Sequence, residues 1–156
     1  MDRRIQLHQS SRSSTLDLDA ADAWAVVASG RPGPQWHVDA LPFVVRGALD
    51  RALGGAGRRW PPPDRTLLET GDRVGFWRVT DTRRRTLVLE AEVRSPGLVR
   101  LTTSVHAAGP GRCTVKQAVR FEPDGLVGQL YLLADLPARE AVVELTHRRL
   151  LADLGG

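Results

Sequence analysis

Residues 71–122 decide the fold and read GDRVGFWRVTDTRRRTLVLEAEVRSPGLVRLTTSVHAAGPGRCTVKQAVRFE. They predict four consecutive β-strands, at 73–80, 86–94, 99–107 and 113–122. In the second of these, apolar residues occupy every other position: Leu87, Leu89, Ala91 and Val93. Glu90 and Glu92 fall between them. A period of two is typical of a strand that buries one face and leaves the other in solvent.

The sequence Ser-Pro-Gly at 95–97 predicts a chain reversal between the second and third strands, because proline fixes φ and glycine tolerates positive φ. Counting outward from this turn gives a register for the hairpin: Val93 opposite Val99, Ala91 opposite Leu101, Leu89 opposite Thr103, and Glu92 opposite Arg100. This register joins apolar residues on one face and opposite charges on the other. A slip of one residue would undo both agreements.

Two polar residues interrupt the inward face. After a second turn at 108–111, the strand at 113–122 points Gln117 inward and brings it beside Thr103. A buried polar group needs a hydrogen-bonding partner. The two side chains therefore either hydrogen-bond to each other, or they offer hydrogen bonds to a ligand inside a cavity.

Helices are expected around the strands. After a short strand at 13–18, Asp19 can cap a first helix, and residues 41–53 predict a second one with Pro42 near its start. The apolar residues expected to be buried by the second helix are Phe43, Val45, Leu49 and Leu53. Residues 54–72, rich in glycine, arginine and proline, predict a surface loop. In the strand at 73–80, either Trp77 or Phe76 points inward.

A long helix is expected from Gly125 to the C-terminus, with a break or kink near Pro137. Its apolar residues fall at helical spacings: Leu126, Leu130, Leu133, Ala141 and Leu145. The predicted fold class is α+β, with a curved antiparallel sheet wrapped around this helix and two short helices near the N-terminus. We expect one domain over residues 1–156, in which residues 1–12 form a flexible or partly ordered arm.

Composition restricts the class of protein. The net charge is +4, and Lys116 is the sole lysine among 22 basic residues. Acidic residues are scattered among the arginines and no aromatic stacking motif accompanies them, so nucleic-acid binding is disfavoured. Cys113 is the single cysteine, which is compatible with a reducing compartment. No secretory signal and no membrane span are predicted, and a cytoplasmic location is expected.

No catalytic motif stands out. The four histidines lie in four different segments, so we predict no metal site, and no cofactor is expected. A serine or cysteine nucleophile has no recognisable elbow, and no glycine-rich phosphate loop is present. Glu90 and Glu92 fall on the outward face, which disfavours an acid–base pair. Whether the protein is an enzyme is left open, and so is its oligomeric state.

The order of elements resembles that of the START-like, or helix-grip, superfamily, which includes birch-pollen allergen and aromatic polyketide cyclases. The closer resemblance, to a bacterial branch of unknown function, covers about the last 85 residues. It is carried by Gly71-Asp72, Phe76-Trp77-Arg78-Val79, Glu90-Ala91-Glu92, Ser95-Pro96-Gly97, Gln117, Phe121-Glu122-Pro123, Gly125-Leu126-Val127-Gly128, Leu130-Tyr131 and Leu136-Pro137. The resemblance implies an apolar cavity between the sheet and the long helix, with no catalytic residues to carry over.

The candidate ligand-binding residues are those expected to face this cavity: Trp77, Leu89, Leu101, Thr103, Gln117, Leu130 and Tyr131. The favoured function is binding of a small hydrophobic molecule, such as a lipid, a sterol or a polyketide-like compound. The first alternative is a cyclase-like enzyme that acts by shaping a polyketide-type substrate. The second is a non-catalytic interaction domain whose core is filled by the same residues.

Overall fold

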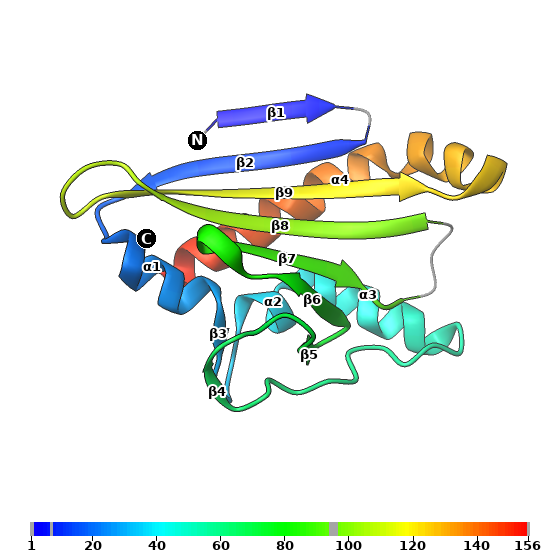
Figure 1. The fold of residues 1–156 in the computed structure, drawn as a ribbon. Helices are drawn as coiled ribbons and strands as arrows, with labels where there is room; N and C mark the ends of the chain where they lie inside the picture. The colour runs from blue at the N-terminus through cyan, green and yellow to red at the C-terminus, as the bar shows by residue number, and fades with distance from the viewer. Residues whose placement is uncertain (1, 7, 94–96, 156) are drawn as a thin grey trace.

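The computed structural model describes residues 2–6, 8–93 and 97–155, and the side chains of 8–93, 97–128 and 136–155. In this part of the chain, seven strands form one antiparallel sheet in the order β1-β2-β9-β8-β7-β6-β5 (Figure 1). The strands are β1 (Asp2–Gln6), β2 (Gln9–Leu16), β5 (Arg73–Val74), β6 (Trp77–Asp81), β7 (Thr86–Ala91), β8 (Gly97–Ala107) and β9 (Cys113–Pro123). A second small sheet pairs β3 (Ser29–Gly30) with β4 (Arg65–Leu67).

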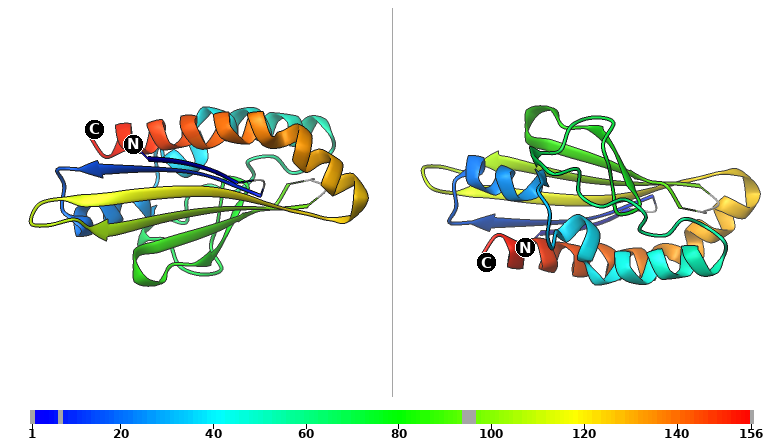
Figure 2. Two further views of the ribbon diagram at one scale, coloured as in Figure 1. Left: turned by 90° about the horizontal axis from the view of Figure 1, so that it is seen from above. Right: turned by 90° about the horizontal axis from the view of Figure 1, so that it is seen from below.

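Four helices and one 3₁₀ turn complete the described chain. They are α1 (Ala20–Val27), α2 (Trp36–Asp39), α3 (Leu41–Ala52), η1 (Arg83–Arg85) and α4 (Gly125–Asp153). Helix α4 runs along the sheet and packs against β9 and β2, while α3 lies beside α4 (Figure 2). The predicted α+β architecture, with its long C-terminal helix and short N-terminal helices, is confirmed.

The hairpin of β7 and β8 keeps the predicted faces but not the predicted register. Leu89 pairs with Leu101, Leu87 with Thr103, and Glu90 with Arg100. Each partner is shifted by two residues from the expected one. The reason is that β7 ends at Ala91 and β8 begins at Gly97, which makes the connection longer than a tight turn. A shift of two preserves the inward and outward faces. Residues 94–96 of the expected turn lie outside the described residues.

The N-terminal segment differs from the expected arm. Residues 2–6 form β1, and β2 begins at Gln9 and pairs with β9 over its whole length. Ser10 and Arg12 are buried beneath α4. The sequence pattern predicts only residues 13–18 as a strand, so it misses the first half of β2. The inward positions there are polar, and the alternation of apolar and polar residues that marks a buried strand is therefore absent.

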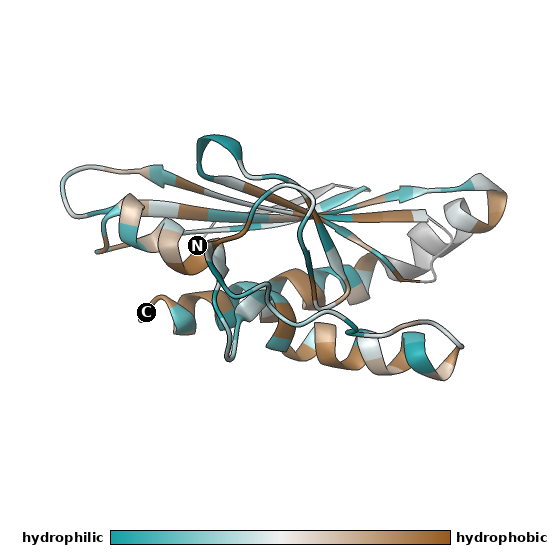
Figure 3. Ribbon diagram, turned by 60° about the horizontal axis from the view of Figure 1, so that its bottom comes forward, coloured by the Kyte–Doolittle hydropathy of each residue, from teal (hydrophilic) through white to brown (hydrophobic). Residues whose placement is uncertain are grey.

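Helix α3 buries a different face from the expected one. Phe43 is buried as predicted, but Val45, Leu49 and Leu53 are 51%, 52% and 63% exposed, so their expected burial is wrong. Hydrophobic and hydrophilic positions are interspersed along the helices (Figure 3). The other buried positions of α3 are Gly47 and Asp50. The segment after α3 covers that side: a Cβ at Gly47 would lie 2.5 Å from Cγ of Arg58, and Asp50 accepts a hydrogen bond from the backbone of Gly57.

Helix α4 also differs from its apolar pattern. It is continuous through Pro137, so the expected break is absent, although Figure 2 shows that its first half bends. Leu126 and Leu145 are exposed. The buried residues of α4, among those whose side chains are described, are Gly128, Arg139, Val143, Thr146, His147 and Leu150. Three of these six are polar, because α4 crosses the polar inward positions of β2 and β9.

Candidate functional site

A chain of hydrogen bonds links α4 to three strands. The Nε2 atom of Gln117 donates to Oγ1 of Thr103 at 3.1 Å, and Oε1 of Gln117 lies 3.2 Å from Nδ1 of His147. On the other side of the imidazole, Nε2 of His147 lies 2.8 Å from Oγ of Ser14. Thr103, Gln117 and His147 are fully buried. The predicted neighbours Thr103 and Gln117 therefore satisfy each other, and a histidine that the sequence pattern did not single out completes the set.

The hydrogen-bond directions in this chain agree with a neutral imidazole. Because the Gln117 amide nitrogen faces Thr103, its oxygen accepts from Nδ1–H of His147. Nε2 is then free to accept a hydrogen bond from the Ser14 hydroxyl. Burial lowers the pKa of His147 to about 4, so the ring is neutral at pH 7. The arrangement resembles a nucleophile–base pair, but neither Ser14 nor His147 is on the described wall of the apolar cavity between the sheet, α3 and α4.

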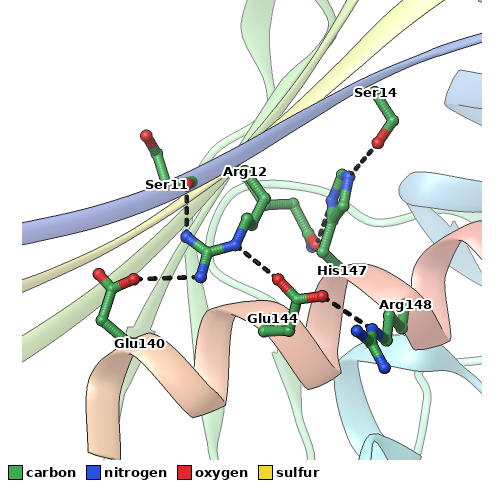
Figure 4. A network of polar contacts seen from close by, with 8 residues as sticks. Ser11, Arg12, Ser14, Glu140, Glu144, His147 and Arg148 are labelled. Carbon is green, nitrogen blue, oxygen red and sulfur yellow. Dashed lines mark hydrogen bonds and ion pairs between the residues drawn. The ribbon is translucent and has the colours of Figure 1, made fainter. Parts of the chain in front are cut away.

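A buried ion-pair cluster lies beside this chain (Figure 4). Arg12 pairs with Gln117 across β2 and β9, and its guanidinium donates to Glu144 at 2.6 Å and to Glu140 at 3.1 Å. The third contact is to the backbone oxygen of Ser11. The hydrogen bond from Arg12 lowers the pKa of Glu144. Arg12 therefore ties β2 to α4 and serves the fold.

A cavity of about 120 Å³ lies between the sheet, α3 and α4. Its floor consists of inward residues from four neighbouring strands: Trp77 of β6, Ala91 of β7, Val99 of β8 and Phe121 of β9. Trp77 pairs with Ala91, and Val99 pairs with Phe121, so the floor is one row across the sheet. Val93, Val119 and Phe76 extend this apolar surface.

The two helices cover the floor. Pro42, Phe43 and Arg46 of α3 line one side, and Arg139 and Val142 of α4 line the other. Phe43 packs edge-on against Trp77, with ring centroids 5.2 Å apart, and against Phe76, at 5.7 Å. Arg139 is 2% exposed and donates to Oγ of Ser10 at 3.2 Å. The cavity is thus apolar and aromatic, with two guanidinium groups on its helical side.

The seven candidate residues fall into three groups. Trp77 lines the cavity. Leu89 and Leu101 are fully buried in the core, and Thr103 and Gln117 belong to the hydrogen-bond chain; none of these four is on the described cavity wall. The side chains of Leu130 and Tyr131 lie outside those that the structure describes. Trp77 therefore connects the sequence hypothesis to the cavity, while the residues from α3 were not expected.

The described residues offer neither a metal centre nor an activated thiol. No group of three or more histidine, cysteine or carboxylate side chains in that part of the chain is placed to hold a metal ion. Burial raises the pKa of the Cys113 thiol, which disfavours the thiolate. None of the described helices is both long and apolar enough to cross a membrane.

The fold is similar to those of several solved structures. The chain is similar to a protein from Arthrobacter aurescens, with a TM-score of 0.56, 14% identity, and 99% of this chain and 92% of that chain covered. It is also similar to the Zhui aromatase/cyclase from a Streptomyces species, with a TM-score of 0.44, 13% identity, and coverage of 97% and 93%. Norcoclaurine synthase from Thalictrum flavum gives a TM-score of 0.40, 15% identity, and coverage of 86% and 85%. The antiparallel sheet with the long helix α4 packed against it is the helix-grip arrangement that the sequence predicts.

The family follows from the sequence itself. Residues 5–146 match the model of the family described as "Protein of unknown function (DUF2867)", and the chain belongs to this family. No curated protein matches the sequence at a significant level.

Proposed function

We propose that this protein binds a small hydrophobic molecule in the cavity between the sheet and helices α3 and α4. The observation that carries the proposal is the cavity itself, whose floor is the row formed by Trp77, Ala91, Val99 and Phe121. Ligand sites are typically concave and apolar, with a few polar groups that orient the ligand. The arginines at positions 46 and 139 are such groups here.

The size of the cavity narrows the class of ligand. An apolar cavity of about 150 Å³ holds one benzene ring, and this cavity measures about 120 Å³. It matches a single aromatic ring or the end of an aliphatic chain. A lipid or a polyketide-like molecule would place one end in it, and a sterol would leave most of its ring system outside.

Binding is favoured over catalysis by the chemistry of the cavity wall. The ionisable groups on the described wall are the guanidinium groups of Arg46 and Arg139. Arginine stays protonated in proteins, so neither group serves as a general base at neutral pH. Among the described wall residues, a cyclase-like reaction would have only the shape of the cavity and these two cations to act with. The existence of the cavity speaks against an interaction domain with a filled core.

Two measurements test the proposal. Native mass spectrometry of the purified protein is expected to detect a small molecule that leaves on denaturation. In a thermal-shift panel of single-ring aromatics, fatty acids and sterols, a fitting ligand at 100 times its Kd should stabilise the fold by about 2.7 kcal/mol. This corresponds to a rise in Tm of roughly 5 to 10 °C for a domain of this size. No bound molecule and no shift across the panel would contradict the proposal.

A further inference from the structure

Helix α3 presents an apolar face to solvent. Its buried residues, Phe43, Gly47 and Asp50, lie on one side of the helix. On the other side, a set of exposed apolar residues recurs at spacings of three and four, and we call this set the outer face of α3. Its members are Leu41, Val45, Ala48, Leu49, Ala52 and Leu53. Such a spacing is typical of a helix face that packs against another apolar surface.

The outer face is a continuous stripe that the fold leaves uncovered. It runs from Leu41 in the first turn to Leu53 at the C-cap, a length of about 18 Å for a helix of this size. Single exposed apolar residues are normal on a protein surface, whereas a contiguous patch marks an interaction site. The cavity does not account for it, because α3 lines the cavity with Pro42, Phe43 and Arg46.

The exposed charge around the outer face is positive. Residues 41–63 contain four arginines, and their single acidic residue, Asp50, is 1% exposed and accepts a hydrogen bond from the backbone of Gly57. Arg51 and Arg59 are exposed, and neither forms an ion pair with a described residue. An apolar stripe beside unpaired arginines is complementary to a surface that is both apolar and anionic.

A second copy of the chain fits this face poorly. Pairing two outer faces would bring arginine against arginine, with no exposed carboxylate on α3 to pair with them. A stable protein interface uses about 20 to 30 residues a side, and the outer face has six. A lipid surface has neither restriction. At the boundary between headgroups and acyl chains, an amphipathic helix buries its apolar face while its arginines contact phosphates.

We propose that α3 docks on an anionic phospholipid surface, with its outer face at the headgroup boundary and Arg51 at the lipid phosphates. The inference goes beyond the proposed function, because it concerns the side of α3 that faces away from the cavity. The two are linked through the helix itself: Pro42 and Phe43 line the cavity. Docking of the outer face therefore brings one wall of the cavity to the lipid.

The test is co-sedimentation of the full chain with vesicles of phosphatidylcholine alone, or of phosphatidylcholine with about 30% phosphatidylglycerol. An arginine near an anionic surface contributes about fivefold in affinity. With Arg51 and Arg59 both exposed, we expect at least about tenfold tighter binding to the anionic vesicles. Raising the salt to about 0.5 M should remove this preference by screening. Equal binding to the two kinds of vesicle, or binding to neither, would contradict the proposal.

Two variants assign the binding to α3. Leu49→Gln should weaken binding to the anionic vesicles by about fivefold or more, because a half-exposed leucine no longer enters the lipid. Leu145→Gln makes the same change at an exposed leucine of α4 outside the outer face, and should bind as wild type does. Both positions are exposed, so both variants should fold, which circular dichroism checks.

Two results with Leu49→Gln would overturn the proposal. One is vesicle binding equal to that of wild type. The other is a wild-type dimer, detected by sedimentation without lipid, that Leu49→Gln dissociates, since it would assign the outer face to a second copy. The proposed ligand binding would stand in either case, because Leu49 is not on the described cavity wall.

Discussion

His147 of α4 and Gln117 of β9 lie with Nδ1 and Oε1 3.2 Å apart in the fully buried space between helix and sheet. Because the Gln117 amide also donates to Thr103, the imidazole is connected to the central strand β8 as well as to β9. Because Thr103 and Gln117 bond to each other and are not on the described cavity wall, we expect them to act on the stability of the fold.

Gln117→Leu should lower the free energy of unfolding by about 1 to 3 kcal/mol, because it leaves the N–H of His147 and the hydroxyl of Thr103 without a buried partner. Chemical denaturation measures the loss. The affinity for a cavity ligand should stay within about twofold of wild type. A large loss of affinity in a folded Gln117→Leu protein would instead place this residue in the binding site.

Stability should fall as the pH drops from about 6.5 toward 4. Burial lowers the pKa of His37 and of His147 to about 4, whereas an unfolded histidine titrates near 6.5. In this window the unfolded state binds more protons than the folded state, so acid favours unfolding. Each ring contributes about 2 kcal/mol between pH 6.5 and pH 5.

Urea titrations at pH 7 and pH 5 measure this loss, and His147→Gln removes one of the two rings. The variant should be less stable at pH 7 but lose only about half as much stability between the two pH values. An unchanged pH dependence in His147→Gln would show that this ring titrates normally in the folded protein.

Arg12→Met should cost about 3 kcal/mol, because it removes the buried guanidinium that ties β2 to both Glu140 and Glu144 of α4, although Glu144 keeps its ion pair with Arg148. Arg73→Met is the matched control. It breaks an ion pair with Glu92 on the outer face, where the Arg73 side chain is 47% exposed, and should cost less than about 1 kcal/mol. Equal losses in the two variants, measured by denaturation, would contradict the difference in burial.

Phe43→Ala should cost about 3 kcal/mol, because Phe43 is 3% exposed and packs on two aromatic rings. Leu49→Ala on the same helix removes a side chain that is 52% exposed and should change stability by less than about 1 kcal/mol. A larger loss at Leu49 would show that the outer face of α3 is covered.

The sheet was predictable because period-2 alternation survives wherever the inward residues are apolar. Leu87, Leu89 and Leu101 are buried as expected, and Glu90 and Glu92 are on the outer face. The exact register was not predictable, since alternation is unchanged by a shift of two residues and only the length of the connection after Ala91 decides it.

The contacts of β2 and α4 were hidden for one shared reason. Their facing positions are polar: Ser10 bonds to Arg139, Ser14 bonds to His147, and Arg12 bonds to Glu140 and Glu144. A pattern of apolar residues cannot reveal a polar interface. Similarly, Gly47 lies on the buried face of α3 because the following loop packs there, which the sequence of the helix alone does not encode.

The central claim is that the cavity beside Trp77 is a ligand site, and the most direct test fills it. Val99→Phe places a ring on the cavity floor, whereas Val105→Phe makes the same change on the same strand at a packed position away from the cavity. The measurement is the rise in Tm caused by acetophenone, one of the single-ring aromatics of the thermal-shift panel, in wild type and in both variants. We predict that Val99→Phe folds with nearly wild-type stability and shows no rise. Val105→Phe should be about 1 to 3 kcal/mol less stable through overpacking but retain the rise. A ligand-induced rise that persists in Val99→Phe would contradict the account.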